Sequence, residues 1–207
     1  MKLALPTLTL GLAALTSAQY DIESKPFRLV LSSKDKTVDG QTLSACHVGA
    51  AIESLCLSGV PSTSKPDFIP AATFRFNTSS TVGTPSAPAG GVPGVLTYKL
   101  NATPPIPSSL QFSYDPTTDF ALPLLFPGTG ASTQTLAFDS KNRLNVQGYV
   151  DYTTSPPTAG EYKPYYRWYA CLTYFSVYEY ENLVWALGDG KPETPGCAKV
   201  DVKRVFI

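Results

Sequence analysis

Histidine is nearly absent from this sequence, because His47 is the only one among 207 residues. A zinc or copper site that needs several imidazoles therefore cannot be assembled, and a Ser-His-Asp triad would have to use this one residue. The Gly-x-Ser-x-Gly turn that carries the nucleophile of many hydrolases is also missing. We interpret His47, next to Cys46, as a structural residue, and we expect no metal ion and no cofactor.

Charge is sparse, and neither sign is concentrated in one region. Lys and Arg together number 16, as do Asp and Glu, and charged residues make up 15% of the chain. Nucleic-acid binding depends on a basic stripe that displaces counterions, whereas the basic residues here are scattered. No segment is apolar for the roughly 20 residues that a membrane helix needs, and the C-terminus has no hydrophobic tail behind a polar spacer. We therefore expect no nucleic-acid partner and no membrane anchor.

One apolar run does occur, in residues 1–18, MKLALPTLTLGLAALTSA. It follows the single basic residue Lys2 and closes with the small residues Thr16-Ser17-Ala18, which is typical of a secretory signal peptide. We therefore expect a secreted, extracellular protein. Residues 19–207 would then form a single disulfide-stabilised β domain, since this length suits one hydrophobic core.

The chain contains four cysteines, Cys46, Cys56, Cys171 and Cys197. An even number of cysteines on a secreted chain indicates disulfides. Four cysteines allow three pairings, among which sequence alone does not decide. The spacing favours Cys46–Cys56 and Cys171–Cys197, because partners that are near in sequence meet more often during folding.

Two triplets match the acceptor pattern for N-linked glycans, Asn77-Thr78-Ser79 and Asn101-Ala102-Thr103. Both lie beside polar or proline-rich segments, where a bulky glycan can project into solvent. We therefore expect a glycoprotein modified at Asn77 and Asn101.

Short apolar segments alternate with clusters of the 19 prolines and 15 glycines. This pattern is typical of many short strands joined by turns, and it predicts an all-β antiparallel β-sandwich, with a β-trefoil or small barrel as the alternative. Asp139 and Asn142 flank Ser140-Lys141 in a tight hairpin. The proline-rich stretch Pro156–Pro164 reads as a loop. The strands that we expect cover residues 27–33, 44–57, 73–77, 94–101, 109–115, 133–139, 142–150, 165–175, 182–188 and 197–207.

Ten aromatic residues lie between positions 162 and 185. The period of a strand places either Trp168 or Cys171 toward the core, and the sequence leaves this choice open. Tyrosine and tryptophan are favoured in packed strands, so we interpret most of the stretch, including Trp185, as core. Four tyrosines border loops and are expected to be exposed, where they could bind a ligand: Tyr162, Tyr165, Tyr178 and Tyr180.

The chain resembles a family of small secreted proteins from filamentous ascomycete fungi, an uncharacterised domain with no assigned activity. The resemblance implies a fungal source, secretion and two local disulfide pairs, and it supplies no catalytic residue. Its most specific blocks are FRLVLSS, LSACHVGAAIESLCL, LNVQGYVDYT, YYRWYACLT and CAKVDVKRVF.

The functional expectation is a non-catalytic extracellular binding or surface protein that recognises a cell-wall glycan or a partner protein. The alternative is a small secreted hydrolase, because a glycosidase needs only two facing carboxylates. The carboxylates nearest the aromatic stretch are Asp139, Asp151, Glu179 and Glu181.

Overall fold

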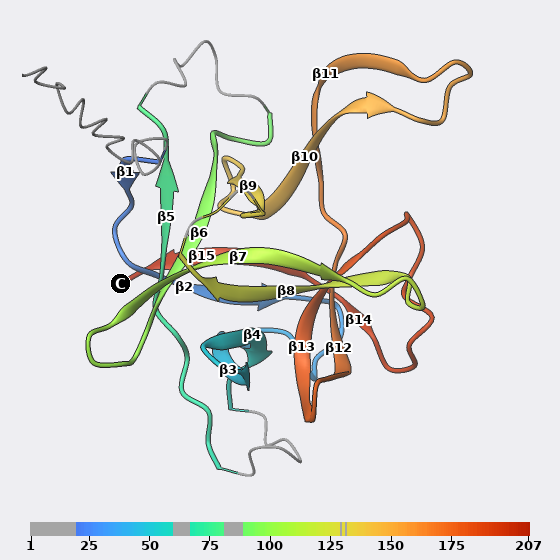
Figure 1. The fold of residues 1–207 in the computed structure, drawn as a ribbon. Coiled ribbons are helices and arrows are strands. Elements are labelled where there is room, and N and C mark those ends of the chain that lie inside the picture. The colour runs from blue at the N-terminus through green and yellow to red at the C-terminus, as the bar shows by residue number, and fades with distance from the viewer. Residues whose placement is uncertain (1–19, 60–66, 81–88, 129, 131) are drawn as a thin grey trace, which may run out of the picture.

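The computed structural model describes residues 20–59, 67–80, 89–128, 130 and 132–207. The predicted signal peptide, residues 1–18, lies outside the described residues. The described part of the chain is built from strands and contains no helix (Figure 1). No helix in this part is therefore long and apolar enough to cross a membrane.

The strands of the described residues follow one another with short connections. They are β1 (Ile22–Glu23), β2 (Phe27–Ser32), β3 (Leu43–Gly49), β4 (Ile52–Leu57), β5 (Phe74–Thr78), β6 (Pro93–Leu100), β7 (Ile106–Tyr114), β8 (Phe120–Pro127), β9 (Thr135–Phe138), β10 (Leu144–Asp151), β11 (Thr158–Tyr165), β12 (Trp168–Phe175), β13 (Tyr178–Ala186), β14 (Ala198–Lys199) and β15 (Asp201–Phe206).

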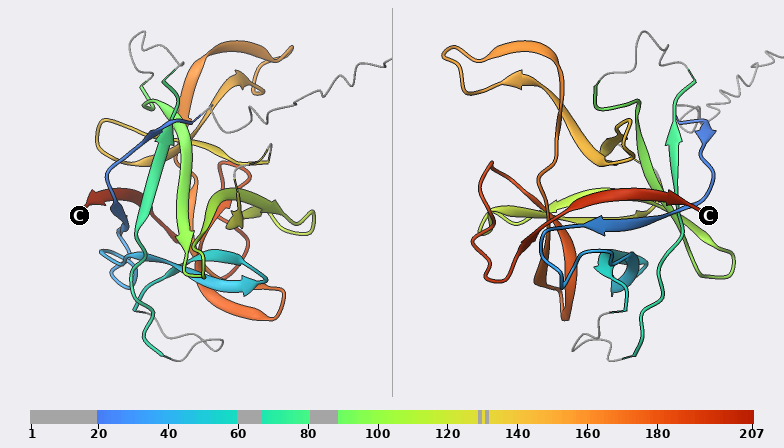
Figure 2. Two further views of the ribbon diagram at one scale, coloured as in Figure 1. Left: turned by 60° about the vertical axis from the view of Figure 1, so that its left-hand side comes forward. Right: turned by 180° about the vertical axis from the view of Figure 1, so that it is seen from behind.

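All the strand pairs are antiparallel, and the sheet curls until its ends meet. The ladders lead from β5 through β6, β7, β8, β13 and β12 to β14. Only Val200 separates β14 from β15, which pairs with β2, and β2 returns to β5 through the pair Phe27–Phe74. The predicted all-β antiparallel class is confirmed, and the curled sheet fits a sandwich or a small barrel (Figures 1 and 2).

The aromatic strand β12 has a hydrophobic cluster on each face. Trp168 and Ala170 belong to the larger cluster, together with Trp185, and Tyr169 and Cys171 belong to the second cluster. The sequence posed a choice between Trp168 and Cys171 for the core, and the structure buries both. The interpretation of the stretch as mainly core, Trp185 included, is therefore confirmed.

Two strands form where proline made the sequence read differently. The stretch Pro156–Pro164 was predicted as a loop, but most of it belongs to β11, an edge strand where the missing N–H of Pro164 is tolerated. Strand β8 contains Pro123 and escaped prediction. One edge of β8 pairs with β13 before Pro123 and with β4 after it, so this residue lies between the two ladders on that edge.

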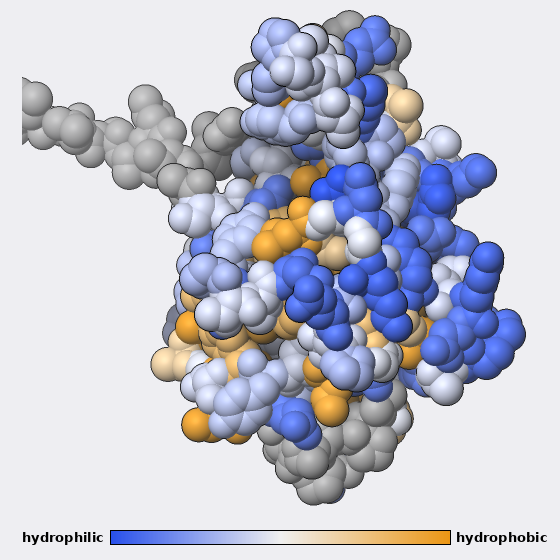
Figure 3. All heavy atoms as spheres, turned by 90° about the vertical axis from the view of Figure 1, so that its right-hand side faces the viewer, coloured by the Kyte–Doolittle hydropathy of each residue, from blue (hydrophilic) through white to orange (hydrophobic). Residues whose placement is uncertain are grey.

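Strands β10 and β11 form a two-stranded arm that projects from the body (Figure 1). Beyond Asn145, β10 pairs only with β11. Tyr149, Tyr152 and Tyr162 are exposed on the arm. The side of the molecule from which the arm extends is mainly hydrophilic, and its apolar residues form small separate patches (Figure 3).

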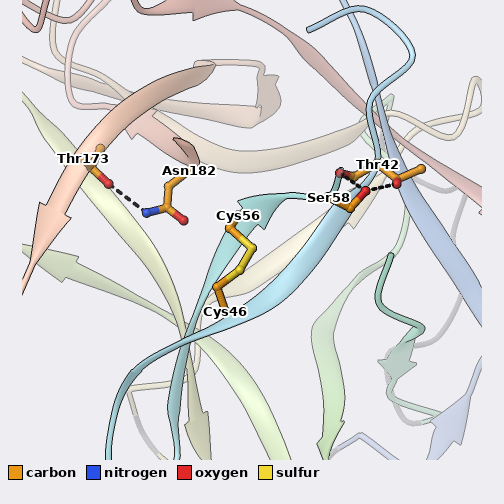
Figure 4. Close-up of a disulfide and its surroundings, with 6 residues drawn as sticks. All are labelled: Thr42, Cys46, Cys56, Ser58, Thr173 and Asn182. Atoms are coloured by element: carbon orange, nitrogen blue, oxygen red, sulfur yellow. Dashed lines mark hydrogen bonds between the residues drawn. A yellow bond between two sulfur atoms is a disulfide. The ribbon is translucent and has the colours of Figure 1, made fainter. Parts of the chain in front are cut away.

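Both disulfides favoured by the spacing are present. Cys46–Cys56 joins β3 to β4 across their hairpin, and Cys171–Cys197 joins β12 to the segment before β14. Asn182 of β13 lies beside the first bridge, opposite Cys56 in the ladder (Figure 4). These crosslinks hold β3 and β4 firmly against the rest of the sheet, which positions the cavity described next.

Candidate functional site

A cavity of about 810 Å³ opens where the β3–β4 hairpin approaches β5 and β6. Its wall also includes residues of β1, β7 and β13 and the segment 69–73. The wall mixes apolar side chains with hydroxyl, amide and charged groups. We refer to this space as the cavity.

Glu53 of β4 is the most unusual residue in the wall. It is only 8% exposed, and its Oε2 atom is buried without a hydrogen-bond partner among the described residues. Burial raises the pKa of this carboxyl above its ordinary value, because the apolar surroundings disfavour the charge. A buried polar group without a partner is costly, so Glu53 can pair with a ligand that enters the cavity.

The position of Glu53 follows from the pairing of its strand. It lies opposite His47 in β3 and opposite Leu125 in β8, so β4 is an interior strand at this point. Sequence reasoning did not select Glu53. The available signal was a single carboxylate in the apolar segment Ile52–Leu57, where a charge is out of place unless it has a role.

Tyr98 of β6 lies close enough to Glu53 to feel its charge. Burial raises the pKa of the half-buried Tyr98 hydroxyl, and the negative charge of Glu53 raises it further. A protonated Glu53 can donate a hydrogen bond into the cavity, and an ionised one can only accept. The two groups therefore form a polar pair that can bind a hydroxyl or amide of a ligand.

Charged groups also line the cavity, and most of their charge is compensated. Arg75 Nη1 donates to Glu23 Oε1 at 2.8 Å and to the Ser24 carbonyl at 3.3 Å. Lys99 is exposed on the same wall. With Glu53 protonated, the site carries little net charge, which favours a neutral polar ligand over a strongly charged one.

Hydroxyl groups complete the polar part of the wall. Ser44 and Ser108 are buried there. Thr97 donates from Oγ1 to the Arg75 carbonyl at 3.3 Å and to Asn77 Oδ1 at 3.2 Å. Such groups both donate and accept, which suits a ligand rich in hydroxyls.

Two of the predicted ligand-binding tyrosines belong to the surroundings of the cavity. Tyr178 and Tyr180 stack with their ring centres 6.5 Å apart, and His47 packs edge-on against Tyr178 at 5.1 Å. Tyr180 lines the cavity but is only 3% exposed, so the expectation that it is exposed was wrong. Its ring faces the second hydrophobic cluster, beside the Cys46–Cys56 bridge, and this packing removes it from solvent.

The other two predicted tyrosines lie on the arm. Tyr162 is 55% exposed and contacts Tyr149, with ring centres 5.3 Å apart. Tyr165 is half-buried beneath the guanidinium of Arg167, which lies 5.0 Å from its ring centre. The hollow beside Tyr165 has a volume of only about 90 Å³. The four tyrosines are therefore divided between two places and do not form one platform.

None of the carboxylates that the sequence nominated for a hydrolase lines the cavity. Asp139 accepts bonds from Arg143 and Tyr166, and Asp151 accepts bonds from Thr153 in a turn. Glu181 is half-buried on β13 and Glu179 lies two residues before it; burial, and then the charge of Asp35, raises the pKa of Glu181. The carboxylates in the cavity wall are Glu23 and Glu53 instead.

Both predicted glycosylation sites also border the cavity, although they differ in accessibility. Asn77 is half-buried in β5, whereas Asn101 is exposed in the turn after β6. Within the described ranges, no group of three or more His, Cys, Asp or Glu side chains is arranged to hold a metal ion.

Comparison with known proteins identifies a family but no function. Residues 24–206 match the family described as Domain of unknown function (DUF7907). The chain belongs to the DUF7907 family. The extent of the match covers every strand from β2 to β15. No curated protein and no solved structure matches the chain, so for this DUF7907 protein the arguments about function come from the cavity itself.

Proposed function

We propose that this DUF7907 protein is a secreted, non-catalytic binding protein and that its ligand occupies the cavity. The observation that carries the proposal is the buried, unpartnered carboxyl of Glu53 in the wall of a space of about 810 Å³. Ligand sites for small molecules typically have volumes of about 300–1,000 Å³, with a few placed polar groups in a largely apolar wall. The cavity has both properties.

A glycan is the ligand class that the wall favours over a partner protein. Tyr98 and Tyr180 supply aromatic surface, and Ser44, Ser108 and Thr97 supply hydroxyls. A sugar presents apolar ring faces and hydroxyl edges, so it matches both kinds of group. A concave site also suits one or two sugar units better than the broad surface of a protein.

Retention on insoluble chitin, cellulose and β-1,3-glucan tests the proposal. Glu53→Gln keeps the size of the side chain, and Tyr98→Phe removes only a hydroxyl. We expect each to weaken retention about tenfold, because a lost interaction of about 1.4 kcal/mol has this effect. The matched control is the arm variant Tyr149→Ala/Tyr162→Ala, for which retention should stay unchanged. Absence of retention on every polysaccharide, or loss only in the arm variant, contradicts the proposal.

A carboxylate-dependent hydrolase is the second candidate, and one observation favours it. Burial raises the pKa of Glu53, which is the condition that a general acid needs near neutral pH. Glu23 would have to serve as the second carboxylate, but Arg75 holds it in an ion pair. Release of soluble sugar from the same polysaccharides, abolished by Glu53→Gln while retention persists, would favour catalysis over binding.

A further inference from the structure

The two glycan acceptor triplets lie far apart in sequence, yet both asparagines border the same cavity. They reach it from different structural contexts. Asn77 is in the ladder region of β5, and Asn101 follows the last residue of β6. This difference decides which of them can carry a glycan in the folded protein.

Asn77 is enclosed by its neighbours. It pairs with Glu23 of β1 on one edge and with Val95 of β6 on the other. Its Oδ1 accepts a hydrogen bond from Thr97, and Ser79, the third residue of the acceptor triplet, is buried. A glycan on this side chain would have to fill the cavity or break the contacts with β6.

Asn101 has the opposite surroundings. It is exposed at the start of the turn that joins β6 to β7, and Thr103, the third residue of its triplet, is exposed as well. Because Asn101 is both exposed and part of the cavity wall, it lies at the opening. A glycan attached here can extend into solvent across that opening without disturbing any ladder.

We propose that Asn101 carries an N-linked glycan that limits access to the cavity, while Asn77 stays unmodified. The proposal rests on secretion, because the donor is an oligosaccharide linked to a lipid pyrophosphate in the secretory pathway. A bond forms between Asn101 Nδ2 and the anomeric carbon of the oligosaccharide. The bond from that carbon to the pyrophosphate oxygen breaks, the lipid pyrophosphate leaves, and the amide nitrogen loses one proton.

Site mapping tests which asparagine is modified. The full chain, with its own N-terminus, is secreted from a yeast host and treated with peptide N-glycosidase in ¹⁸O water, which converts a glycosylated asparagine into labelled aspartate. Mass spectrometry should find the label at Asn101 and none at Asn77. Label at Asn77, an unlabelled Asn101, or failure of the chain to be secreted would overturn the proposal.

Thiol labelling tests access to the cavity, and it needs no knowledge of the ligand. All four native cysteines are bridged, so a new cysteine is the only free thiol. Thr73→Cys and Lys99→Cys each place a thiol on the exposed part of the cavity wall. Tyr152→Cys places one at the exposed tip of the arm as the control.

The reagent is a negatively charged methanethiosulfonate. Removal of the glycan should speed labelling at position 73 or 99 several-fold and leave position 152 unchanged. Asn101→Gln in the Thr73→Cys background should label at the fast rate without treatment. Equal rates before and after treatment at both wall positions contradict the access role. A failed polysaccharide assay together with a rate change here would overturn the proposed ligand class and leave this proposal standing.

Discussion

Glu53 is the residue on which the proposed function depends, and its cost to the fold is measurable. Its folded-state pKa is raised above the ordinary value, so the folded state retains the proton more strongly than the unfolded chain. The contribution of Glu53 to stability is therefore fully present below its unfolded pKa and is lost as the pH rises through its folded pKa.

Glu53→Gln should remove this pH dependence. We expect the free energy of unfolding of the variant to improve relative to the native chain between pH 4 and pH 8, because glutamine never ionises. Urea unfolding at both pH values measures the difference. A constant difference between variant and native chain across this range would show that Glu53 does not titrate in the cavity.

Asp139 shows the reverse behaviour in the turn between β9 and β10. Burial alone would raise the pKa of this carboxyl, but hydrogen bonds from Arg143, Tyr166 and Lys141 outweigh it and lower the pKa. Its contribution to stability is therefore present above the unfolded pKa and is lost as the pH falls through the folded pKa. The predicted Ser140-Lys141 hairpin is confirmed, and these bonds explain its geometry.

Tyr166→Phe tests this arrangement with a single atom removed. Tyr166 Oη donates to Asp139 at 2.8 Å, and burial, reinforced by that bond, raises the pKa of Tyr166 to about 12. We expect the variant to lose about 1.5 kcal/mol of stability at pH 7, the value typical of a hydrogen bond to a charged group, and less in acid. Tyr152→Phe, at the exposed arm tip, should change nothing. Equal effects of the two variants would contradict this account.

At the scale of elements, the sequence predicted strands well where patterning was local. Period and turn residues located β2, β5 and the β9–β10 hairpin. They did not locate β8 or β11, because proline reads as a break when the neighbouring strands are unknown. Glu53 and Tyr180 were missed or misplaced for the same reason, since their burial depends on which distant strands cover β4 and β13.

The two disulfides should contribute unequally to stability. Their partners are separated by 10 and 26 residues, and loop-closure entropy gives contributions of about 2.7 and about 3.5 kcal/mol respectively. We therefore expect Cys171→Ala/Cys197→Ala to cost more than Cys46→Ala/Cys56→Ala in denaturant unfolding. The reverse order would show that native contacts, rather than the unfolded chain, dominate the effect.

The arm should be the least stable element among the described strands. Its outer part pairs only within itself and buries few side chains, and an isolated two-stranded ribbon is marginal in water. Hydrogen exchange should therefore be much faster in residues 149–160 than in β12, which has hydrophobic clusters on both faces. Equal protection of the two segments would indicate that something else covers the arm.

For the whole molecule, the curled sheet and its bridges form a rigid body with one large cavity in the described part, and the central claim is that this cavity binds a sugar. The most direct measurement is a map of amide chemical shifts of the ¹⁵N-labelled protein with N,N′-diacetylchitobiose, cellobiose and laminaribiose. The account expects shifts around Glu53, Tyr98 and Ser108 with at least one of these sugars, weakened in Glu53→Gln. Shifts confined to the arm, or none with any sugar, would contradict it.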